Sequence, residues 1–229
     1  MGLYLTPMRY TQKRFYSWSE NLAYLVGLIA SDGCLQKDGR HIDITSTDLE
    51  ILQNVLVALN RNIKIGTKVN KSKKPAFHVQ FSDIGLYDFL LSISLTPQKS
   101  HTINKLSIPD AYYPDFLRGV VDGDGSFYGY SDKRWKSSDM YYLGIYSAST
   151  DFLKFIRYKN TKLFRVSEVN IKPSTRAHVL SYAKSDTRTI FNKIYHSDSC
   201  LKLTRKYNKI SNFISSDRNG TICEHAQVA

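Results

Sequence analysis

Residues 24–33 read YLVGLIASDG, and residues 116–125 read FLRGVVDGDG. Each stretch is a short apolar run that contains two small residues four positions apart and ends in Asp-Gly. The copies are separated by 92 residues (124 − 32) in a chain of 229 residues, so each opens one half of the protein. The repeat predicts two similar units that pack together and contribute one matching acidic group each.

The composition narrows the class of partner. The chain carries 32 basic and 20 acidic residues, a net charge of +12, which favours a polyanion such as nucleic acid or an anionic membrane surface. No apolar run approaches the roughly 18 residues of a membrane-spanning helix. The N-terminus lacks the apolar core of a secretory signal, and three widely spaced cysteines fit a reducing compartment. We therefore expect an intracellular protein, in the cytoplasm of a prokaryote or in a mitochondrion or chloroplast.

The first half alternates helical and strand-like patterns. Ser19 is a suitable N-cap for a buried helix that Gly33 ends, and Asp83 opens a further helix through residue 91. Between them we expect a strand at 41–45, a helix at 49–59, and strands at 63–69 and 77–81 joined by a turn at 70–75.

The second half repeats this order. A helix beginning at Pro114 is followed by a strand at 141–147 and by a helix at 152–163, which Ser149-Thr150-Asp151 is expected to cap. Strands at 165–171 and 178–182 around a turn at 172–175, and a helix at 186–195, complete the same order. We expect an α+β fold of two pseudo-symmetric αββαββα halves, at 1–108 and 109–229. The tail at 215–229 has little periodicity, so partial disorder is expected there.

The alternation along the strands leaves one face of each sheet apolar, under the helices, and one face free and polar. Two such sheets side by side would form a long basic surface that can lie along a DNA groove. The expected DNA contacts are Arg40, Lys68, Lys71, Lys73, Lys74, Gln80, Tyr128, Lys133, Arg134, Lys136, Lys172 and Arg176. For the lysines at 71–74, a merely solvated loop is an equally open interpretation.

Residues 25–33 and 117–125 resemble the LAGLIDADG signature of homing endonucleases, in the form that carries two motifs in one chain. The order of elements extends the resemblance over nearly the whole chain. It implies that the two motif helices form the interface between the halves and that the sheets form a saddle over DNA. It also implies that an aspartate pair cuts both strands across the minor groove.

The residues themselves support this interpretation. Gly27 and Ser31 lie one turn apart on one helix face, as do Gly119 and Gly123, and small residues at this spacing let two helices approach closely. Such packing would bring Asp32 and Asp124 together at the helix ends. Paired carboxylates suit Mg²⁺, with Mn²⁺ as an expected substitute, and bound metal can activate water for phosphodiester hydrolysis. The resemblance adds the backbone carbonyls near Ser31 and Gly123 as metal ligands.

The first copy departs from the signature at Ala30 and Ser31 but keeps Asp32. Asp122 matches a less critical acid of the motif and is expected to cap or pair locally. Near the end of each half, Lys99 and Lys206 match segments in which the family carries a lysine near the active site. A lysine there could take part in catalysis, and a lysine that contacts phosphate or is merely solvated is an equally open interpretation. Lys202 and Arg205 are weaker candidates.

The sequence thus predicts a monomeric, Mg²⁺-dependent, site-specific double-strand DNA endonuclease, encoded by an intron rather than an intein. The predicted partner is a long asymmetric DNA duplex, with no membrane. Two alternatives stay open: an RNA-binding maturase that assists splicing of intron RNA, and a DNA-binding protein of the same fold that does not cleave. Retention of Asp32 and Asp124 argues against the second.

Overall fold

A computed structural model describes residues 14–69, 75–131 and 139–225. The first half contains α1 (Glu20–Ser31), β1 (Gly33–Leu35), β2 (His41–Ser46), α2 (Leu49–Leu59), β3 (Gly66–Val69), β4 (Pro75–Ser82), α3 (Ile84–Ser92) and α4 (Lys99–Thr102). After the 3-10 turn η1 (Asp110–Tyr112), the second half contains α5 (Tyr113–Asp124), β5 (Gly125–Ser131), β6 (Asp139–Ser147), α6 (Thr150–Phe164), β7 (Ile171–Ser174), β8 (Ala177–Tyr182), α7 (Lys184–Ile194) and α8 (Thr204–His225).

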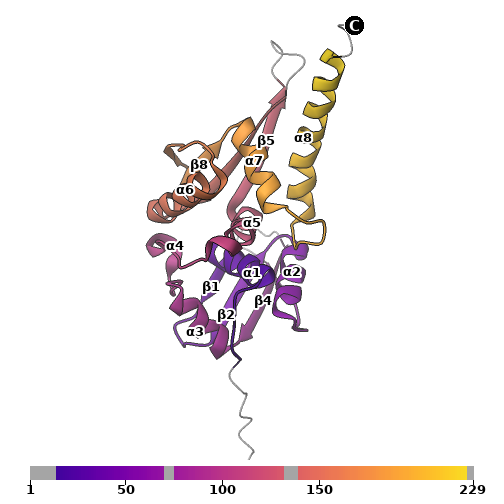
Figure 1. Cartoon of the computed structure of the whole chain (residues 1–229). Helices are drawn as coiled ribbons and strands as arrows, with labels where there is room; N and C mark the ends of the chain where they lie inside the picture. The colour runs from indigo at the N-terminus through magenta and orange to yellow at the C-terminus, as the bar shows by residue number, and fades with distance from the viewer. Residues whose placement is uncertain (1–13, 70–74, 132–138, 226–229) are drawn as a thin grey trace, which may run out of the picture.

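The two halves have the same sheet topology. Each sheet is antiparallel and four-stranded, with the order β1-β2-β4-β3 in one and β5-β6-β8-β7 in the other. The registers also match, since Gly33 pairs with Ile44 where Gly125 pairs with Ile145. In Figure 1 the sheets lie at opposite ends of the molecule, with α1 and α5 between them. The predicted α+β fold of two αββαββα-like halves is confirmed.

Predicted helix caps are present at three helix starts. The Ser19 hydroxyl accepts a hydrogen bond from the Leu22 amide at 3.2 Å, and the Asp83 carboxylate accepts from the Leu86 amide at 2.9 Å. Ser149 does the same for Phe152 at the start of α6. A capping side chain satisfies an amide that the helix itself leaves unpaired, which fixes where each helix begins.

Two glycines set the distance between α1 and α5. A Cβ atom on Gly27 would lie 2.1 Å from the Phe116 carbonyl oxygen, and one on Gly119 would lie 2.1 Å from the Tyr24 carbonyl oxygen. Both obstacles are backbone, which cannot rotate away. The two helices therefore touch backbone to backbone. The residues of α1 from 22 to 30 are all buried, so the crossing is also the centre of the hydrophobic core.

Four local expectations differ from the structure. In the first half, the strand expected at 63–69 begins only at Gly66, and residues 63–65 have no regular structure. Gly33 does not adopt the left-handed conformation of a helix-ending glycine; it starts β1, and a Cβ there would lie 2.7 Å from the Ile29 Cα. In the second half, residues 165–170 are not a strand, and the expected turn at 172–175 lies later, because β7 continues to Ser174. The left-handed residue of this turn is Arg176.

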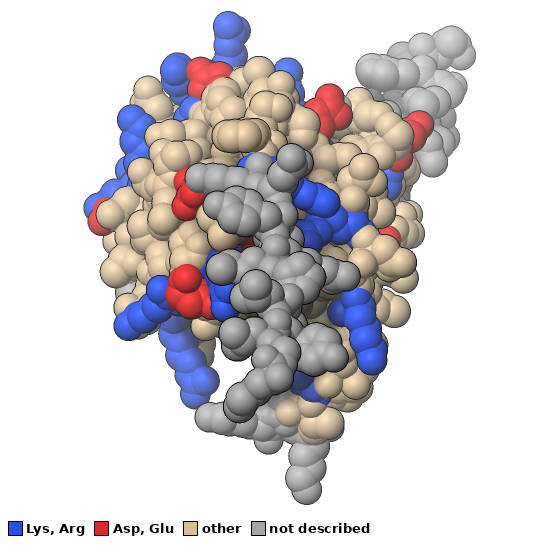
Figure 2. Space-filling model, turned by 90° about the horizontal axis from the view of Figure 1, so that it is seen from below, with Lys and Arg blue, Asp and Glu red and all other residues tan. Residues whose placement is uncertain are grey.

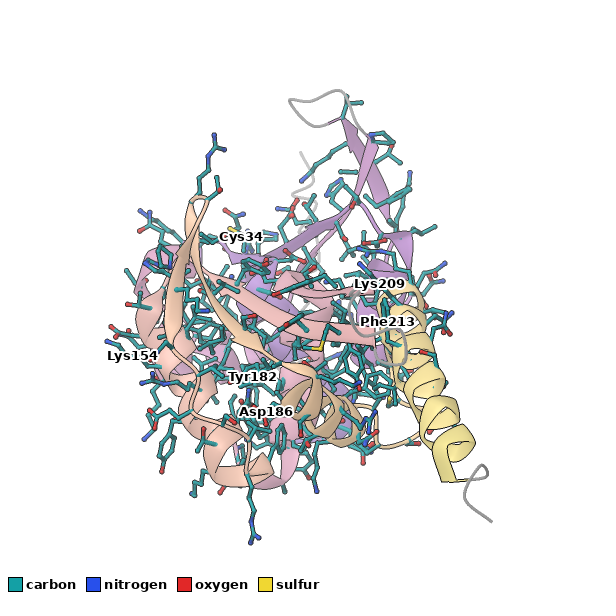
Figure 3. The ribbon with its side chains drawn as sticks, turned by 90° about the horizontal axis from the view of Figure 1, so that it is seen from above. Cys34, Lys154, Tyr182, Asp186, Lys209 and Phe213 are labelled. Carbon is teal, nitrogen blue, oxygen red and sulfur yellow. The ribbon has the colours of Figure 1, made fainter. Side chains whose placement is uncertain are left out.

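Within the described residues α8 continues to His225, past residue 215, where the sequence loses its periodicity; the partial disorder expected for the tail stays a prediction. Ile210 and Ile214 are buried, and the Phe213 ring stacks on Tyr141 with centroids 6.1 Å apart. Figure 3 shows Phe213 on the side of α8 that faces the rest of the second half. Once packing has started a helix, each further residue is easily added. Among the described helices, none is long and apolar enough to cross a membrane.

Candidate functional site

The helix crossing brings the ends of the two repeated motifs together. A Cβ on Gly123 would lie 2.0 Å from the Ser31 hydroxyl and 3.2 Å from a carboxylate oxygen of Asp32. Asp124 is the next residue, the last of α5, and Asp32 directly follows α1. The structure therefore places Ser31 against Gly123 and both carboxylates at one point between the two sheets.

The two carboxylates influence one another. Burial raises the pKa of Asp32 to about 6, and repulsion by Asp124 adds to this effect. Burial also raises the pKa of Asp124. Both side chains still reach solvent, because their residues are exposed by surface area. The carboxyl groups thus lie among packed protein but open onto water. Negative charge gathered in this way is stabilised by a cation.

Two lysines from the far ends of the halves meet the motifs here. Lys99 and Lys206 are only 6% and 8% exposed. The Lys99 ammonium donates to the Ser31 carbonyl oxygen at 3.0 Å. Burial lowers the pKa of both ammonium groups, and the nearby carboxylates oppose this shift. Two buried ammonium groups beside two acids give the site cations that can face a phosphate.

Lys206 is held more tightly than Lys99. Its ammonium donates to the carbonyl oxygens of Val121, Asp122 and Gly123, at 2.9, 2.7 and 2.8 Å. Three donors and three acceptors are thereby matched. The carbonyls of Ser31 and Gly123, which the family resemblance assigns to metal, thus each accept a lysine proton. A carbonyl oxygen has a second lone pair, which leaves each one able to bind a cation as well.

Asp122 was expected to cap or pair with residues near it in the sequence. It pairs instead with residues from three distant segments. Its buried carboxylate accepts hydrogen bonds from the Tyr24 hydroxyl at 2.9 Å, the Tyr195 hydroxyl at 3.2 Å and the Leu203 amide at 2.8 Å. Burial raises its pKa to about 6 although these hydrogen bonds act in the opposite direction. The sequence gives no signal for this role, because all three partners lie more than 70 residues away.

The weaker candidates have other partners. The Lys202 ammonium donates to the Asp198 carbonyl at 2.7 Å and lies over the Tyr207 ring. Arg205 makes a bidentate pair with Asp48 at 2.7 and 2.6 Å, which ties the start of α8 to α2 of the first half. Both side chains therefore support the segment that carries Lys206.

The free face of the first sheet is polar and charged. His41, Asp43 and Thr45 of β2 alternate with buried isoleucines, and Gln80 is exposed on β4 opposite Asp43. Lys68 is ion-paired with Asp43 at 3.3 Å. Arg40 lies just before β2 with its side chain 58% exposed. An acidic group thus stands in the middle of the face predicted to bind DNA, with a basic partner.

The free face of the second sheet is aromatic. Tyr128 is 39% exposed, stacks on Tyr142 at a centroid distance of 5.2 Å, and shares a hydrogen bond with the Ser181 hydroxyl. Lys172 is exposed on β7, and Arg176 is exposed at the following turn. The registers align Gly144 with Asp43, so the two faces differ at their centres.

Some predicted DNA contacts lie outside the described residues: Lys71, Lys73, Lys74, Lys133, Arg134 and Lys136. Figure 2 views the molecule from the end formed by the first half. Where the surface is not covered by grey atoms, Lys and Arg side chains are scattered around the margin and also lie beside the grey atoms near the middle, with a few acidic side chains among them.

One further cluster of possible metal ligands occurs within the described ranges, formed by Glu20, Asp115 and His196. The Asp115 carboxylate is buried and already pairs with Arg118 at 2.7 Å and with His196 at 3.0 Å. Arg118 in turn donates to the carbonyls of Ile194 and Leu201. This cluster joins α5 to the end of α7 and serves the packing of the second half.

The comparisons with known proteins agree with this geometry. Residues 19–92 match the model of the LAGLIDADG-like domain. The homing endonuclease I-WcaI, bound to its DNA recognition sequence, superposes with a TM-score of 0.60 at 12% identity, over 85% of this chain and 88% of that chain. The meganuclease I-AabMI, bound to uncleaved DNA, gives 0.56 at 15% identity, over 88% and 92%.

A third similar structure is full-length DUF199/WhiA from Thermatoga maritima, with a TM-score of 0.57 at 16% identity, over 95% of this chain and 69% of that chain. No curated protein matched by sequence. Identities this low establish the fold alone. Residues 19–92 are thus similar to a LAGLIDADG-like domain, and the chain as a whole has the fold of single-chain LAGLIDADG homing endonucleases.

Proposed function

We propose that this chain, with its LAGLIDADG fold, is a site-specific endonuclease that cuts both strands of duplex DNA and needs a divalent metal ion. The observation that carries the proposal is the meeting of Asp32 and Asp124 at the helix crossing, with Lys99 and Lys206 beside them. A protein that only bound DNA would gain nothing from two acids at this point, since they repel phosphate.

The residues at the crossing fit a hard divalent cation. Asp32 and Asp124 would hold it, with the carbonyls of Ser31 and Gly123 as further oxygen ligands. Burial raises the pKa of both carboxyl groups because it disfavours their charged form, and a bound cation would offset this effect. When bound, Mg²⁺ or Mn²⁺ makes water a better nucleophile and stabilises charge on the leaving oxygen.

The lysines have a separate task. An ammonium group held at a fixed place offsets the charge that grows on a phosphate during hydrolysis, and it costs no rearrangement at that moment. Lys99 and Lys206 are held in this way by backbone carbonyls. Each lysine lies at the end of a different motif helix, so we assign one lysine to each DNA strand.

The substrate is a long duplex that the two sheets bind along their free faces. I-WcaI and I-AabMI are described as bound to DNA, and both superpose over most of this chain. The chain contains both halves, so we expect one copy to bind one site. Because the two free faces differ, that site should be asymmetric, with phosphate contacts from basic residues such as Lys172 and Arg176.

The test is a cleavage selection. The protein is incubated with a randomised duplex library in Mg²⁺, in Mn²⁺ and in EDTA, and the new DNA ends are sequenced. We expect a single long asymmetric motif with staggered ends in both metals and none in EDTA. Sites recovered by binding but never by cutting would instead support the non-cleaving alternative. Preference for folded intron RNA over duplex DNA would support a maturase.

A further inference from the structure

The two motif helices differ at the position two residues before the metal-site aspartate. α1 has Ala30 there, and α5 has Asp122, which is 2% exposed. The three hydrogen bonds to the Asp122 carboxylate come from α1, from the end of α7 and from the segment before α8. Asp122 therefore joins the helix crossing to the chain that leads into α8.

That chain carries Lys206 three residues after Leu203. The Leu203 amide donates to Asp122, and the Leu203 carbonyl accepts from the amides of Lys206 and Tyr207, at 3.0 and 3.1 Å. The first turn of α8 is thus built on a residue that Asp122 holds. The Lys206 ammonium then returns to the backbone of α5 around Asp122 itself.

The rest of this segment is fixed from the first half. Asn54 of α2 donates to the Lys202 carbonyl at 2.9 Å and to the Tyr24 hydroxyl at 3.3 Å. Glu50 accepts hydrogen bonds from Thr204, from the amide at 3.0 Å and from the hydroxyl. With the pair of Arg205 and Asp48, each residue from 202 to 206 has a partner in another element. The segment is rigid as a result.

The segment around Lys99 is built differently. Its helix, α4, has four residues, and it follows Gln98, whose φ of 59° is left-handed. Among the residues that the structure describes, the Lys99 ammonium donates to one carbonyl, that of Ser31. Ala30 has no polar side chain with which to hold this segment as Asp122 holds the other. The two lysines are therefore similar in place but unequal in support.

We infer that Asp122 is a positioning residue for Lys206, so that the two strand-cutting centres depend on different residues and can be impaired one at a time. This inference rests on the proposed endonuclease function. Asp122→Asn keeps the shape of the side chain but replaces one acceptor oxygen with a donor nitrogen, so it cannot accept all three hydrogen bonds as before. The start of α8 should shift, and Lys206 with it.

The experiment uses the full chain and a supercoiled plasmid that carries the selected target site, in Mg²⁺. Nicked and linear products are separated, and the uncut strand of the nicked product is identified by primer extension. We expect Lys206→Met and Asp122→Asn to leave the same strand uncut, and Lys99→Met to leave the other. For Asp122→Asn, cutting of that strand should slow on the order of 10- to 100-fold, the effect of a small misplacement of a catalytic group.

Tyr113→Phe is the matched control for loss of a buried hydrogen bond. The Tyr113 hydroxyl donates to Asn160 at 2.7 Å on α6, away from Lys206, so its removal should slow neither strand selectively. Tyr195→Phe removes one donor to Asp122 and should show a weaker form of the same strand bias, even if Asp122→Asn fails to fold. The inference would be overturned, and the proposed function would stand, if Asp122→Asn and Tyr195→Phe slowed the cutting of both strands equally. The same holds if they slowed the cutting of the strand that Lys99→Met leaves uncut. A wild-type chain that cuts neither strand would overturn the proposed function and the inference together.

Discussion

The ends of α1 and α5 have the same backbone arrangement but carry different side chains. Each helix runs into the first strand of its sheet, and each meets the other helix through a glycine at the same position. One helix ends in Ala-Ser-Asp and the other in Asp-Gly-Asp. The two halves share the glycines that close helix packing requires. They differ in the polar side chains next to the metal-site aspartates. The fold is therefore nearly symmetric although the chemistry around it is not.

The sheets differ in the same way. Registers that match pair for pair place an ion-paired Asp43 in one free face and Gly144 in the other. Since backbone pairing sets the register and side chains read the bases, two half-sites of different sequence can be bound by one repeated scaffold. The comparison of the halves can be tested at four levels.

The largest effect is expected at the acids, where the halves should be equivalent. Asp32→Asn and Asp124→Asn should each reduce double-strand cleavage by on the order of 10⁴-fold, as loss of a catalytic side chain does in other hydrolases. DNA affinity, measured by gel shift in Ca²⁺ or without metal, should change little. Wild-type cutting by either variant would show that the two aspartates do not form the site.

The next effect concerns the crossing, where the halves meet. Gly119→Ala sets a methyl group against the Tyr24 carbonyl and the α1 backbone, whereas Gly123→Ala meets the Ser31 hydroxyl, which can rotate, and the Ser31 Cβ at 2.7 Å, which cannot. We expect a loss of about 2–3 kcal/mol in unfolding free energy for the first variant and about 1–2 kcal/mol for the second. Urea unfolding measures both. An equal loss would mean that α1 and α5 can move apart.

A smaller effect is expected in the pH dependence of stability without metal. The folded pKa of Asp32 is about 6, above the usual 3.8, so the folded state binds the proton more tightly than the unfolded state. Stability should then fall as pH rises from about 4 to 6 and stay low above it. In EDTA, Asp32→Asn should raise Tm at pH 7.5 and leave it unchanged near pH 4. A variant with lower Tm at pH 7.5 would contradict the sign.

The smallest effect separates the two sheets. Lys172→Met should reduce the slope of log affinity against log salt by about 0.9, the value for one phosphate contact. Lys68→Met should change the slope less, because Lys68 is already paired with Asp43. The slopes of the two variants are compared by filter binding at salt concentrations from about 50 to 300 mM, a range over which such slopes are roughly linear. Equal slopes would mean that the Lys68–Asp43 pair opens on DNA.

Local signals predicted much of the fold. Ser19, Asp83 and Ser149 cap the helices that they were expected to cap, and α2 has the predicted bounds. β1 was not predicted, because three residues after a helix carry no periodicity. α8 was missed because its sequence is mostly polar and its packing against Tyr141 is a tertiary contact.

Some residues of the candidate site could likewise be predicted from the sequence, and others could not. Asp32, Asp124 and the glycines stand in a repeat, so their meeting could be predicted from the sequence. The role of Asp122 could not, because its partners are two tyrosine hydroxyls and an amide from three distant segments. The pairing of Lys68 with Asp43 depends likewise on a strand register that joins β3 to β2 through β4.

The backbone contact between Gly27 and Gly119 also means that α1 must wait for its packing partner during synthesis of the chain. The partner of α1 is translated 92 residues later (119 − 27), which takes roughly 5–18 s at ordinary ribosome speeds. Late in this interval all four strands of the first sheet, which end at Ser82, have been translated, whereas the helix that covers one side of α1 has not. One apolar side of α1 therefore stays uncovered in the nascent chain until α5 emerges. A slow codon between the halves would lengthen the time during which this side can aggregate.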